Sequence, residues 1–172
     1  MVTIPWELNT ERMHLRRIGP EHLEDLLELD SDPEVMRYIS GGKPSTREDY
    51  EKFLPRMMAY DDEPFGFLAA YDNERFLGWF HLRPSVADES ILELGYRLRR
   101  EAWGRGLATE GGKALVRYAF ETLDQPAVDA CADPNNAGSI RVMVKCGMHH
   151  VGQFRHPRAP IDVVRYIVER KP

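Results

Sequence analysis

The stretch 91–123 constrains the fold of this 172-residue chain most strongly, because its periodicity changes across two glycines. Apolar residues alternate with polar or small ones in its first part, which predicts a strand with one packed face. Apolar and small residues recur at helical spacing in its last part, which predicts a helix. The alternating residues are Leu92, Leu94, Tyr96 and Leu98, and the helical ones are Leu107, Gly111, Leu115, Tyr118 and Ala119. The centre of the chain is therefore predicted to be a strand–loop–helix unit.

The loop between this strand and this helix is suited to hold a phosphate. Gly104 and Gly106 carry no side chain where the backbone turns, so consecutive N–H groups can point the same way. Unpaired amides at a helix start attract an anion, and the helix dipole adds to that attraction. Arg99, Arg100 and Arg105 would add positive charge around the same loop. We therefore expect a phosphorylated ligand.

Two common phosphate-binding loops do not fit this spacing. A Walker A loop needs Gly-x-x-x-x-Gly-Lys-Ser/Thr, and the sequence contains no such run. The dinucleotide fingerprint Gly-x-Gly-x-x-Gly also fails, because Thr109 stands in the place of its third glycine.

The run Trp103–Glu110 instead resembles the acetyl-CoA loop of the GNAT N-acetyltransferases. The general motif of that family, Arg/Gln-x-x-Gly-x-Gly/Ala, places Gly106 and Ala108 on its small positions and Trp103 on its first position. Tryptophan there departs from the general pattern but suits the RimJ/RimL-like branch, which acetylates the N-termini of ribosomal proteins. The usual form in that branch is Trp-Gly-x-Gly-x-Ala-Thr-Glu, and this chain matches it at every fixed position.

Runs elsewhere in the chain resemble the same branch. The segment Leu8–Arg17 looks like its Leu-x-Thr-Glu-Arg-Leu-x-Leu-Arg opening, and Asp32–Tyr38 looks like its next helix. The segment Asn136–Met148 resembles its Asn-x-x-Ser…Lys-x-Gly-Phe motif, with Met148 in place of the usual Phe and Gly138 where Ala is commoner. The resemblance therefore covers nearly the whole chain.

This resemblance implies a fold and a reaction. The fold would be the α/β GNAT fold, with a mixed central sheet of about seven strands flanked by helices. Two central parallel strands would splay apart, namely the strand ending at Leu98 and the strand 128–132, with the pantetheine arm of CoA between them. Residues 1–172 would form one acetyltransferase domain that uses acetyl-CoA and lets a primary amine attack the thioester directly.

The resemblance also implies cofactor contacts. The backbone of Tyr96, Arg97 and Leu98 would contact the pantetheine and the thioester oxygen. The loop residues expected to bind the cofactor are Trp103, Gly104, Arg105, Gly106, Leu107, Ala108 and Thr109. Asn136 would hydrogen-bond the pantetheine, Ser139 would lie near the sulfur as a proton donor, and Lys145 would reach a cofactor phosphate.

Several of these residues have other interpretations. Asn136 and Ser139 stand three apart at a predicted helix start, where Asn is a favoured N-cap. Lys145 could be a solvated helix lysine. Glu93 lies on the less apolar side of the central strand, where a buried carboxylate could take the proton of the amine directly or through water. It could equally be a solvated or ion-paired glutamate, with Arg97 as a partner.

Further strands and helices are expected along the whole chain. Strands are predicted at 12–18, 65–71, 75–82, 128–132, 148–154 and 163–168. Helices are predicted after Gly19–Pro20, over 32–39, from a Ser45/Glu48 capping box, and from Asn136 to the stop at Gly147.

The sequence predicts no metal site, disulfide, nucleic-acid binding surface or membrane helix. His149 and His150 would point to opposite faces of a strand, so no metal site is predicted. Cys131 and Cys146 are the only cysteines and are expected to be reduced and buried. A net charge of −5 gives no electrostatic case for nucleic-acid binding. The start Met1–Trp6 has no signal-peptide pattern and no run approaches the ~18 apolar residues of a membrane helix, so we expect a cytoplasmic monomer or homodimer.

The resemblance also implies that the acceptor amine enters opposite the cofactor, between the segment 32–43 and the hairpin 154–161. Acidic residues there could attract a cationic amine, and basic ones could suit a substrate with an anion. The acidic residues are Asp30, Asp32, Glu34 and Asp162, and the basic ones are Arg155, His156 and Arg158. The resemblance to the RimJ/RimL-like branch implies an α-amine at a protein N-terminus. Such an amine has a pKa of ~7.7–8.0 against ~10.4 for lysine, so it is easier to deprotonate. The alternatives are a small amine, such as an amino sugar, polyamine, amino acid or drug, and a CoA-binding protein without catalysis.

Overall fold

The computed structural model describes residues 6–172, so the prediction about the start of the chain lies largely outside the described residues. The chain divides into two compact units. The N-terminal unit comprises Met1–His81 and Tyr96–Leu107, and the C-terminal unit comprises Leu82–Gly95 and Ala108–Pro172. Two strands, β4 (Arg75–Pro84) and β5 (Leu92–Leu98), have residues in both units.

The strands form one mixed sheet. In the order of hydrogen-bonded neighbours they are β1 (Glu7–Asn9), β2 (His14–Arg17), β3 (Gly66–Asp72), β4, β5, β6 (Ala127–Ala132), β8 (Asp162–Glu169) and β7 (His149–Arg155). β5 and β6 (Ala127–Ala132) are parallel, whereas β1–β2, β2–β3, β6–β8 and β7–β8 are antiparallel. The predicted α/β fold, with a mixed sheet and helices, is confirmed. Within residues 6–172 the sheet has eight strands rather than about seven. The additional strand is β1 (Glu7–Asn9), which is too short to show a clear alternation in the sequence.

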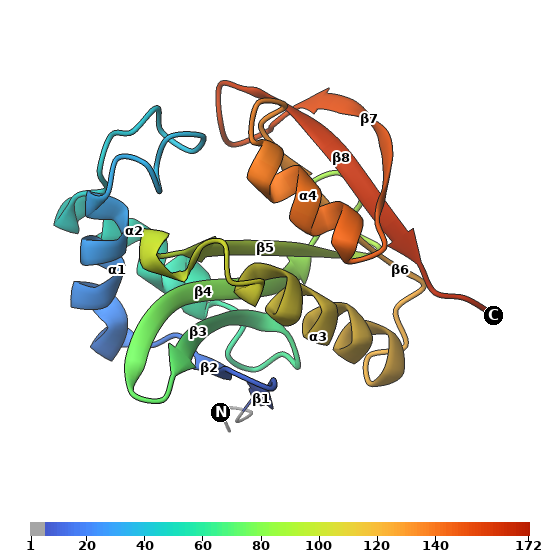
Figure 1. Ribbon diagram of the computed structural model, residues 1–172, viewed down its shortest axis with the longest axis horizontal. Coiled ribbons are helices and arrows are strands. Elements are labelled where there is room, and N and C mark those ends of the chain that lie inside the picture. Colours follow the sequence, from blue (N-terminus) through green and yellow to red (C-terminus); the bar gives the residue numbers. More distant parts are fainter. Residues whose placement is uncertain (1–5) are drawn as a thin grey trace. The chain divides into compact units, whose positions relative to one another are not determined.

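The N-terminal unit packs two helices against its strands. Its elements are β1, β2 (His14–Arg17), the 3-10 turn η1 (Pro20–His22), α1 (Leu23–Ser31), α2 (Arg47–Met58), β3 (Gly66–Asp72), most of β4, and η2 (Arg100–Ala102). Figure 1 shows α1 and α2 side by side. Leu26 and Leu29 of α1 and Leu54 of α2 share a core with Phe76 and Trp79 of β4. The apolar stripes of both helices therefore face the sheet, as their periodicity predicts.

The C-terminal unit is built on the β6–β8–β7 part of the sheet. The strands β7 (His149–Arg155) and β8 (Asp162–Glu169) form a hairpin, and α4 (Ala137–Lys145) packs beside β6 (Figure 1). Most of α3 (Leu107–Glu121) also belongs to this unit. A Cβ at Gly112 of α3 would lie 2.7 Å from Sγ of Cys146 and 3.3 Å from Cδ2 of Leu94. A glycine at this position therefore lets α3 approach both neighbours closely. No helix in residues 6–172 is long and apolar enough to cross a membrane.

The predicted helix over 32–39 is wrong. This segment forms successive turns, and the carbonyl of Met36 accepts hydrogen bonds from the N–H groups of Ile39, Ser40 and Gly42. Gly41 and Gly42 have φ values of 71° and 90°, which a right-handed helix does not allow. These two glycines end the segment before a regular helix can form.

The predicted start of α2 is wrong by one residue. Thr46, not Ser45, is the N-cap, and its Oγ1 accepts a hydrogen bond from the Asp49 N–H at 3.1 Å. The Asp49 carboxylate accepts in turn from the Thr46 N–H at 2.8 Å. An aspartate therefore completes the capping box in place of the expected Glu48.

Candidate active site

The glycine loop has the predicted conformation. Gly104 and Gly106 have φ values of 70° and 76°, in the left-handed region that favours glycine. A Cβ at Gly104 would meet no atom within 4 Å, and one at Gly106 would meet only Nη2 of Arg12, at 3.5 Å. Leu107, the first residue of α3, is buried. An open backbone that leads directly into a helix start suits a phosphate group.

The arginines around this loop pair with carboxylates. Arg100 Nε lies 2.9 Å from Asp32 Oδ2, and Arg105 Nη2 lies 3.5 Å from Asp72 Oδ2. The prediction is wrong for Arg99, whose side chain is only 14% exposed and lies against α1.

The contacts of Arg99 are with α1 and β4. Its Nη1 is 2.8 Å from Glu28 Oε1, and its Nε donates to the carbonyl of Phe76 at 2.9 Å. This arginine therefore ties η2 to α1 and β4.

The Trp103 side chain stays at the surface of the loop. It is 46% exposed, and its Nε1 donates to the carbonyl of Leu98 at 2.9 Å. The indole thus occupies one of the backbone groups that were expected to contact the pantetheine. Tyr96 is half-buried and Leu98 is buried.

Glu93 is a buried carboxylate with a different partner from the expected Arg97. It is 4% exposed, and Arg83 Nη2 donates to its Oε1 at 2.9 Å. The Sγ of Cys131 on β6 lies 3.8 Å from its Oε2. The ion-paired interpretation of Glu93 is therefore confirmed, with Arg83 as the partner.

A second buried carboxylate lies next to Glu93 in the sheet. Asp129 is the register partner of Glu93 in the parallel β5–β6 pair and is 1% exposed. Its Oδ2 accepts from Ser85 Oγ and from Arg165 Nε, both at 2.7 Å, whereas its Oδ1 has no hydrogen-bond partner. Burial raises the pKa of Asp129, and the Glu93 carboxylate adds to that rise while Ser85 and Arg165 oppose it.

The same surroundings keep the Cys131 thiol protonated. Burial, together with the carboxylates of Glu93 and Asp129, raises its pKa to about 12. Cys146 is buried as predicted, whereas Cys131 is only half-buried. Burial raises the pKa of Cys146 to about 11. Neither thiol is a thiolate near neutral pH, so neither is suited to act as a nucleophile.

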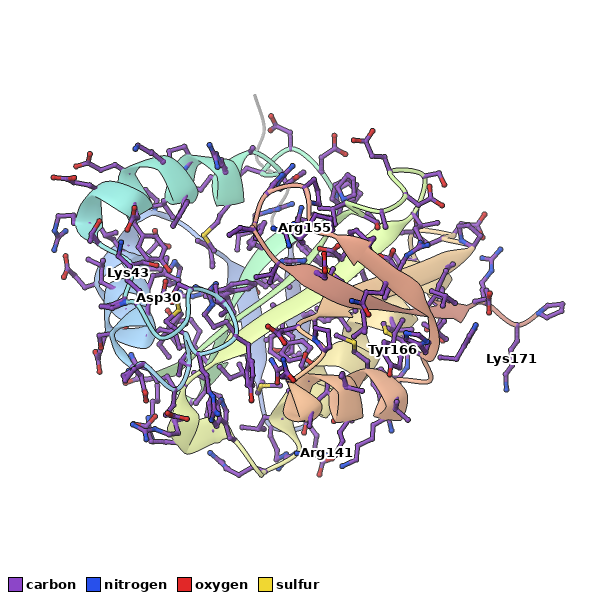
Figure 2. All side chains as sticks on the ribbon, turned by 90° about the horizontal axis from the view of Figure 1, so that it is seen from above. Asp30, Lys43, Arg141, Arg155, Tyr166 and Lys171 are labelled. Atoms are coloured by element: carbon purple, nitrogen blue, oxygen red, sulfur yellow. The ribbon has the colours of Figure 1, made fainter. Side chains whose placement is uncertain are left out.

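Asp30 is not available to attract an amine, contrary to the expectation from the sequence. It is 0% exposed, with Arg97 Nη1 2.7 Å from its Oδ1 and Tyr50 Oη 2.8 Å from its Oδ2. Figure 2 shows Asp30 among the side chains of the N-terminal unit. The Arg97 guanidinium also lies over the Trp79 ring, 5.1 Å from its centroid.

The other acidic residues of the expected acceptor region are also paired. Asp32 faces Arg100 as described, Glu34 Oε2 lies 3.8 Å from Arg37 Nη1, and Asp162 Oδ1 lies 3.5 Å from Arg155 Nη1. His156 accepts a hydrogen bond at Nδ1 from the Arg158 N–H at 3.1 Å. Burial lowers the pKa of His156, partly offset by Glu93.

The start of α4 confirms the structural interpretation of Asn136. Its Oδ1 accepts from the Ser139 N–H at 3.1 Å, so it is the N-cap of the helix. Ser139 is half-buried, and Lys145 is exposed at the other end of the helix. An N-cap role uses one oxygen of Asn136 and does not exclude a ligand contact through its amide nitrogen.

Sequence reasoning missed the partners that hold Glu93 and Asp129. These are Arg83, Ser85 and Arg165, which come from β4, the segment after it, and β8. The available signal was a single charged residue inside the apolar run Ala127–Ala132, because a buried carboxylate needs a partner. Within residues 6–172, no three His, Cys, Asp or Glu side chains are grouped so that they could hold a metal ion.

Comparisons with known proteins agree with the fold. The acetyltransferase (GNAT) domain family matches residues 12–149. FsC-acetyl coenzyme A-N(2)-transacetylase of Aspergillus fumigatus is 33% identical over 179 residues, which cover 95% of this chain and 76% of that protein. A GNAT-family acetyltransferase from Bacillus anthracis superposes with a TM-score of 0.79 at 25% identity, covering 95% of this chain and 98% of that one.

A second similar structure contains coenzyme A. It is RimL, a ribosomal L7/L12 alpha-N-protein acetyltransferase, with a TM-score of 0.77 at 15% identity and coverage of 95% and 97%. At this identity the likeness shows the fold alone. The fold, the glycine loop and the family match together define an acetyl-CoA-dependent N-acetyltransferase. The chain belongs to the GNAT acetyltransferase family.

Proposed function

We propose that this enzyme acetylates the α-amine of a protein or peptide N-terminus. The observation that carries the proposal is the buried Glu93 carboxylate, fixed by Arg83 on the central strand β5. In this mechanism Glu93 takes the proton of the amine, directly or through water, and Ser139 gives a proton to the departing sulfur. The hydroxyl of Ser139 is placed by the first turn of α4.

The cofactor contacts are part of the same proposal. Bound acetyl-CoA supplies the activated acetyl group. Its pyrophosphate would lie over Arg105–Thr109, supported by the positive φ of Gly106 and the open space at its Cβ. The backbone of Tyr96, Arg97 and Leu98 would orient the thioester end, and Asn136 and Lys145 would bind other parts. Trp103, Gly104, Leu107 and Ala108 would complete the binding loop.

The acidity of the acceptor favours an α-amine. An α-amine with a pKa of ~7.7–8.0 is partly neutral at physiological pH, whereas a lysine amine at ~10.4 is almost fully protonated. The central strand β5 carries one carboxylate, Glu93, and no histidine. A single carboxylate or a water molecule is enough to deprotonate an α-amine. Of the two amines, it therefore needs the weaker base in the active site.

A small amine is the second candidate acceptor. The observation that favours it is the Aspergillus fumigatus relative, which is named for transfer to a nitrogen designated N(2) and is 33% identical to this chain. That relative aligns with 95% of this chain, so the alignment includes the segments where the acceptor is expected to bind.

An acceptor panel distinguishes the two candidates. Acetyl-CoA is incubated with matched peptides that begin with Ser or Ala, either free or blocked at the N-terminus and with or without lysine, and with amino sugars, polyamines and amino acids. Released CoA thiol reports turnover, and mass spectrometry locates the acetyl group. The proposal expects transfer to free N-termini. Equal rates with blocked, lysine-containing peptides, or transfer to small amines alone, would reject it and leave the acetyltransferase activity standing.

We also propose a RimJ/RimL-like, cytoplasmic enzyme with one catalytic domain. The match of Trp103–Glu110 to the branch motif supports the first part. The two reduced cysteines support a reducing compartment. The single sheet, to which both units contribute strands, supports one domain. Size-exclusion chromatography with light scattering will decide between monomer and homodimer.

A further inference from the structure

One basic side chain that the sequence analysis did not assign touches the glycine loop. Arg12 Nη1 donates to the backbone carbonyl of Arg105 at 2.8 Å, across 93 residues of sequence. A Cβ on Gly106 would lie 3.5 Å from Nη2 of the same guanidinium. Arg12 therefore lies directly against the two residues whose peptide groups form the turn before α3.

The position of Arg12 is fixed by its own tight turn. The hairpin between β1 and β2 pairs Asn9 with His14, so Arg12 lies in the connection. Within that connection the Thr10 N–H donates to the carbonyl of Met13 at 2.8 Å, and the Met13 N–H donates to Thr10 Oγ1 at 3.0 Å. Met13 is buried and anchors the turn in the core. The guanidinium is thus presented from a pre-ordered backbone rather than from a loose tail.

The bond from Arg12 determines which way a loop amide points. In a trans peptide the carbonyl and the following N–H point to opposite sides of the chain. Because Arg12 holds the Arg105 carbonyl, the Gly106 N–H points away from Arg12, toward the other side of the loop. That side is where a phosphate could accept from loop amides at the helix start.

The side chain of Arg105 is held as well. Its Nη2 lies 3.5 Å from Asp72 Oδ2 at the end of β3, so its backbone contacts one hairpin and its guanidinium another. A loop that is ordered before the ligand arrives loses less conformational entropy on binding.

We propose that Arg12 is a positioning residue for the cofactor: it holds the Arg105–Gly106 peptide so that the Gly106 amide faces the pyrophosphate of CoA. It acts from behind the loop, without contact to the reacting atoms. This inference rests on the proposed placement of the pyrophosphate over Arg105–Thr109.

The test compares three acetyl donors in Arg12→Ala, Arg12→Lys and the wild type. Acetyl-CoA has both the pyrophosphate and the 3′-phosphate, acetyl-3′-dephospho-CoA has only the pyrophosphate, and S-acetylpantetheine has neither. Calorimetry measures the Kd of free CoA and of 3′-dephospho-CoA, so one readout does not depend on turnover. Arg16→Gln is the matched control, because Arg16 is an exposed arginine of the adjoining strand whose Nη2 contacts the Tyr71 hydroxyl instead.

The expected result is a selective loss of pyrophosphate binding. Arg12→Ala should raise the KM for acetyl-CoA and the Kd of CoA about 5-fold, the size expected for loss of one typical hydrogen bond, with kcat unchanged. The same factor should appear with the dephospho donor and disappear with S-acetylpantetheine. Arg12→Lys should recover part of the affinity, and Arg16→Gln should behave like the wild type.

Three outcomes would overturn the inference. A loss with acetyl-CoA but not with the dephospho donor would assign Arg12 to the 3′-phosphate. An equal loss of affinity for S-acetylpantetheine would show that Arg12 supports the fold as a whole rather than pyrophosphate binding. Unchanged Kd values in Arg12→Ala would remove the role altogether. Gly106→Val distinguishes the role of Arg12 from the proposed placement of the pyrophosphate over Arg105–Thr109. If Gly106→Val still binds CoA, that placement is wrong. If Gly106→Val loses CoA binding while Arg12→Ala retains it, only the role of Arg12 is wrong.

Discussion

Arg83 donates to Glu93 across 2.9 Å, and their side chains are only 12% and 5% exposed. The pair lies beside Asp129, which has its own arginine, Arg165. Each buried carboxylate of the β5–β6 pair is thus matched by one guanidinium, which offsets part of the cost of burying it. The pairing fixes the direction of the Glu93 side chain, and direction is the first requirement for a group that receives a proton.

The first prediction concerns Glu93. Glu93→Gln should lower kcat/KM about 100-fold, the lower end for loss of a general base, with the largest effect below neutral pH, where the amine is hardest to deprotonate. Asp129→Asn is the control, since Asp129 is equally buried but is assigned no part in proton transfer. A rate–pH profile of Glu93→Gln that parallels the wild type would show that water alone removes the proton. Arg83→Gln should also destabilise the fold by about 3–5 kcal/mol in urea unfolding, because it leaves Glu93 buried without its partner.

The second prediction concerns the glycine loop. Gly106→Val should remove most of the rise in Tm that CoA produces, because a β-branched residue is strained at a φ of 76° and its side chain would project where the loop is open. Gly41→Val is the matched control, since Gly41 has a similar φ of 71° and its Cβ would meet no atom within 4 Å. Both variants should lose intrinsic stability, but only Gly106→Val should lose the response to CoA. An undiminished CoA shift in Gly106→Val would contradict the loop placement.

The third prediction concerns Ser139. Ser139→Ala should lower kcat more than it raises the KM for acetyl-CoA, if its hydroxyl meets the charge that develops on the sulfur. The N-cap of α4 should survive, because Asn136 accepts from the backbone N–H of residue 139 rather than from its side chain. Asn136→Ala should instead reduce stability by about 1 kcal/mol in chemical denaturation. Wild-type kinetics in Ser139→Ala would leave protonation of the sulfur to water.

The fourth prediction concerns the thiols. With pKa values of about 12 for Cys131 and about 11 for Cys146, the folded enzyme should react with a thiol reagent at pH 8 far more slowly than a model thiol does. Denaturant should release both groups. Mass spectrometry of the labelled protein locates the modified residue, and rapid labelling of Cys131 in the native enzyme would show that its burial is not maintained in solution.

The fifth prediction is a pH dependence of stability through His22. This ring is 1% exposed, its Nδ1 accepts from the Gly19 N–H at 2.9 Å, and burial lowers its pKa against the opposing effect of Glu21. Because the folded state lowers the pKa of His22, it favours the neutral imidazole. The contribution of His22 to folding stability is therefore present above its unfolded pKa of about 6.5 and is lost as the pH falls below that value.

The measurement for His22 is urea unfolding between pH 8 and pH 5. The wild type should lose stability through this window with a slope of up to about 1.4 kcal/mol per pH unit for one proton, and His22→Gln should show a flatter profile. Because burial also lowers the pKa of His156, His156→Gln is measured in parallel. Equal pH profiles for the wild type and His22→Gln would contradict the assignment.

Local patterns in the sequence predicted the elements that local chemistry determines. The positive φ of Gly104 and Gly106, the start of α3 at Leu107 and the N-cap at Asn136 all follow from residues within one turn of each other. The error at 32–39 has the same origin, because two glycines at 41 and 42 determine where the chain turns and lie just beyond the segment that the resemblance emphasised.

Long-range pairing could not be predicted in the same way. The choice of Arg83 over Arg97 as the partner of Glu93 depends on which strands are neighbours in the sheet and on the direction of each side chain. The contact of Arg12 with the Arg105 carbonyl spans 93 residues and involves a backbone acceptor that every residue type has. No periodicity or motif marks such a contact, so it becomes visible only when the chain is folded.

The buried cluster of Asp30, Tyr50 and Arg97 has a practical consequence for redesign of this enzyme. From the sequence alone, Asp30 would be chosen for a mutant library aimed at new amines, because an acidic residue could attract an amine. Substitutions there would leave a charge buried without its partner, so most members of such a library would fail to fold before their selectivity could be scored. A library should instead vary the solvent-facing positions of the segment 156–160, where Pro157 and Arg158 are exposed. Exposed loop positions tolerate substitution best.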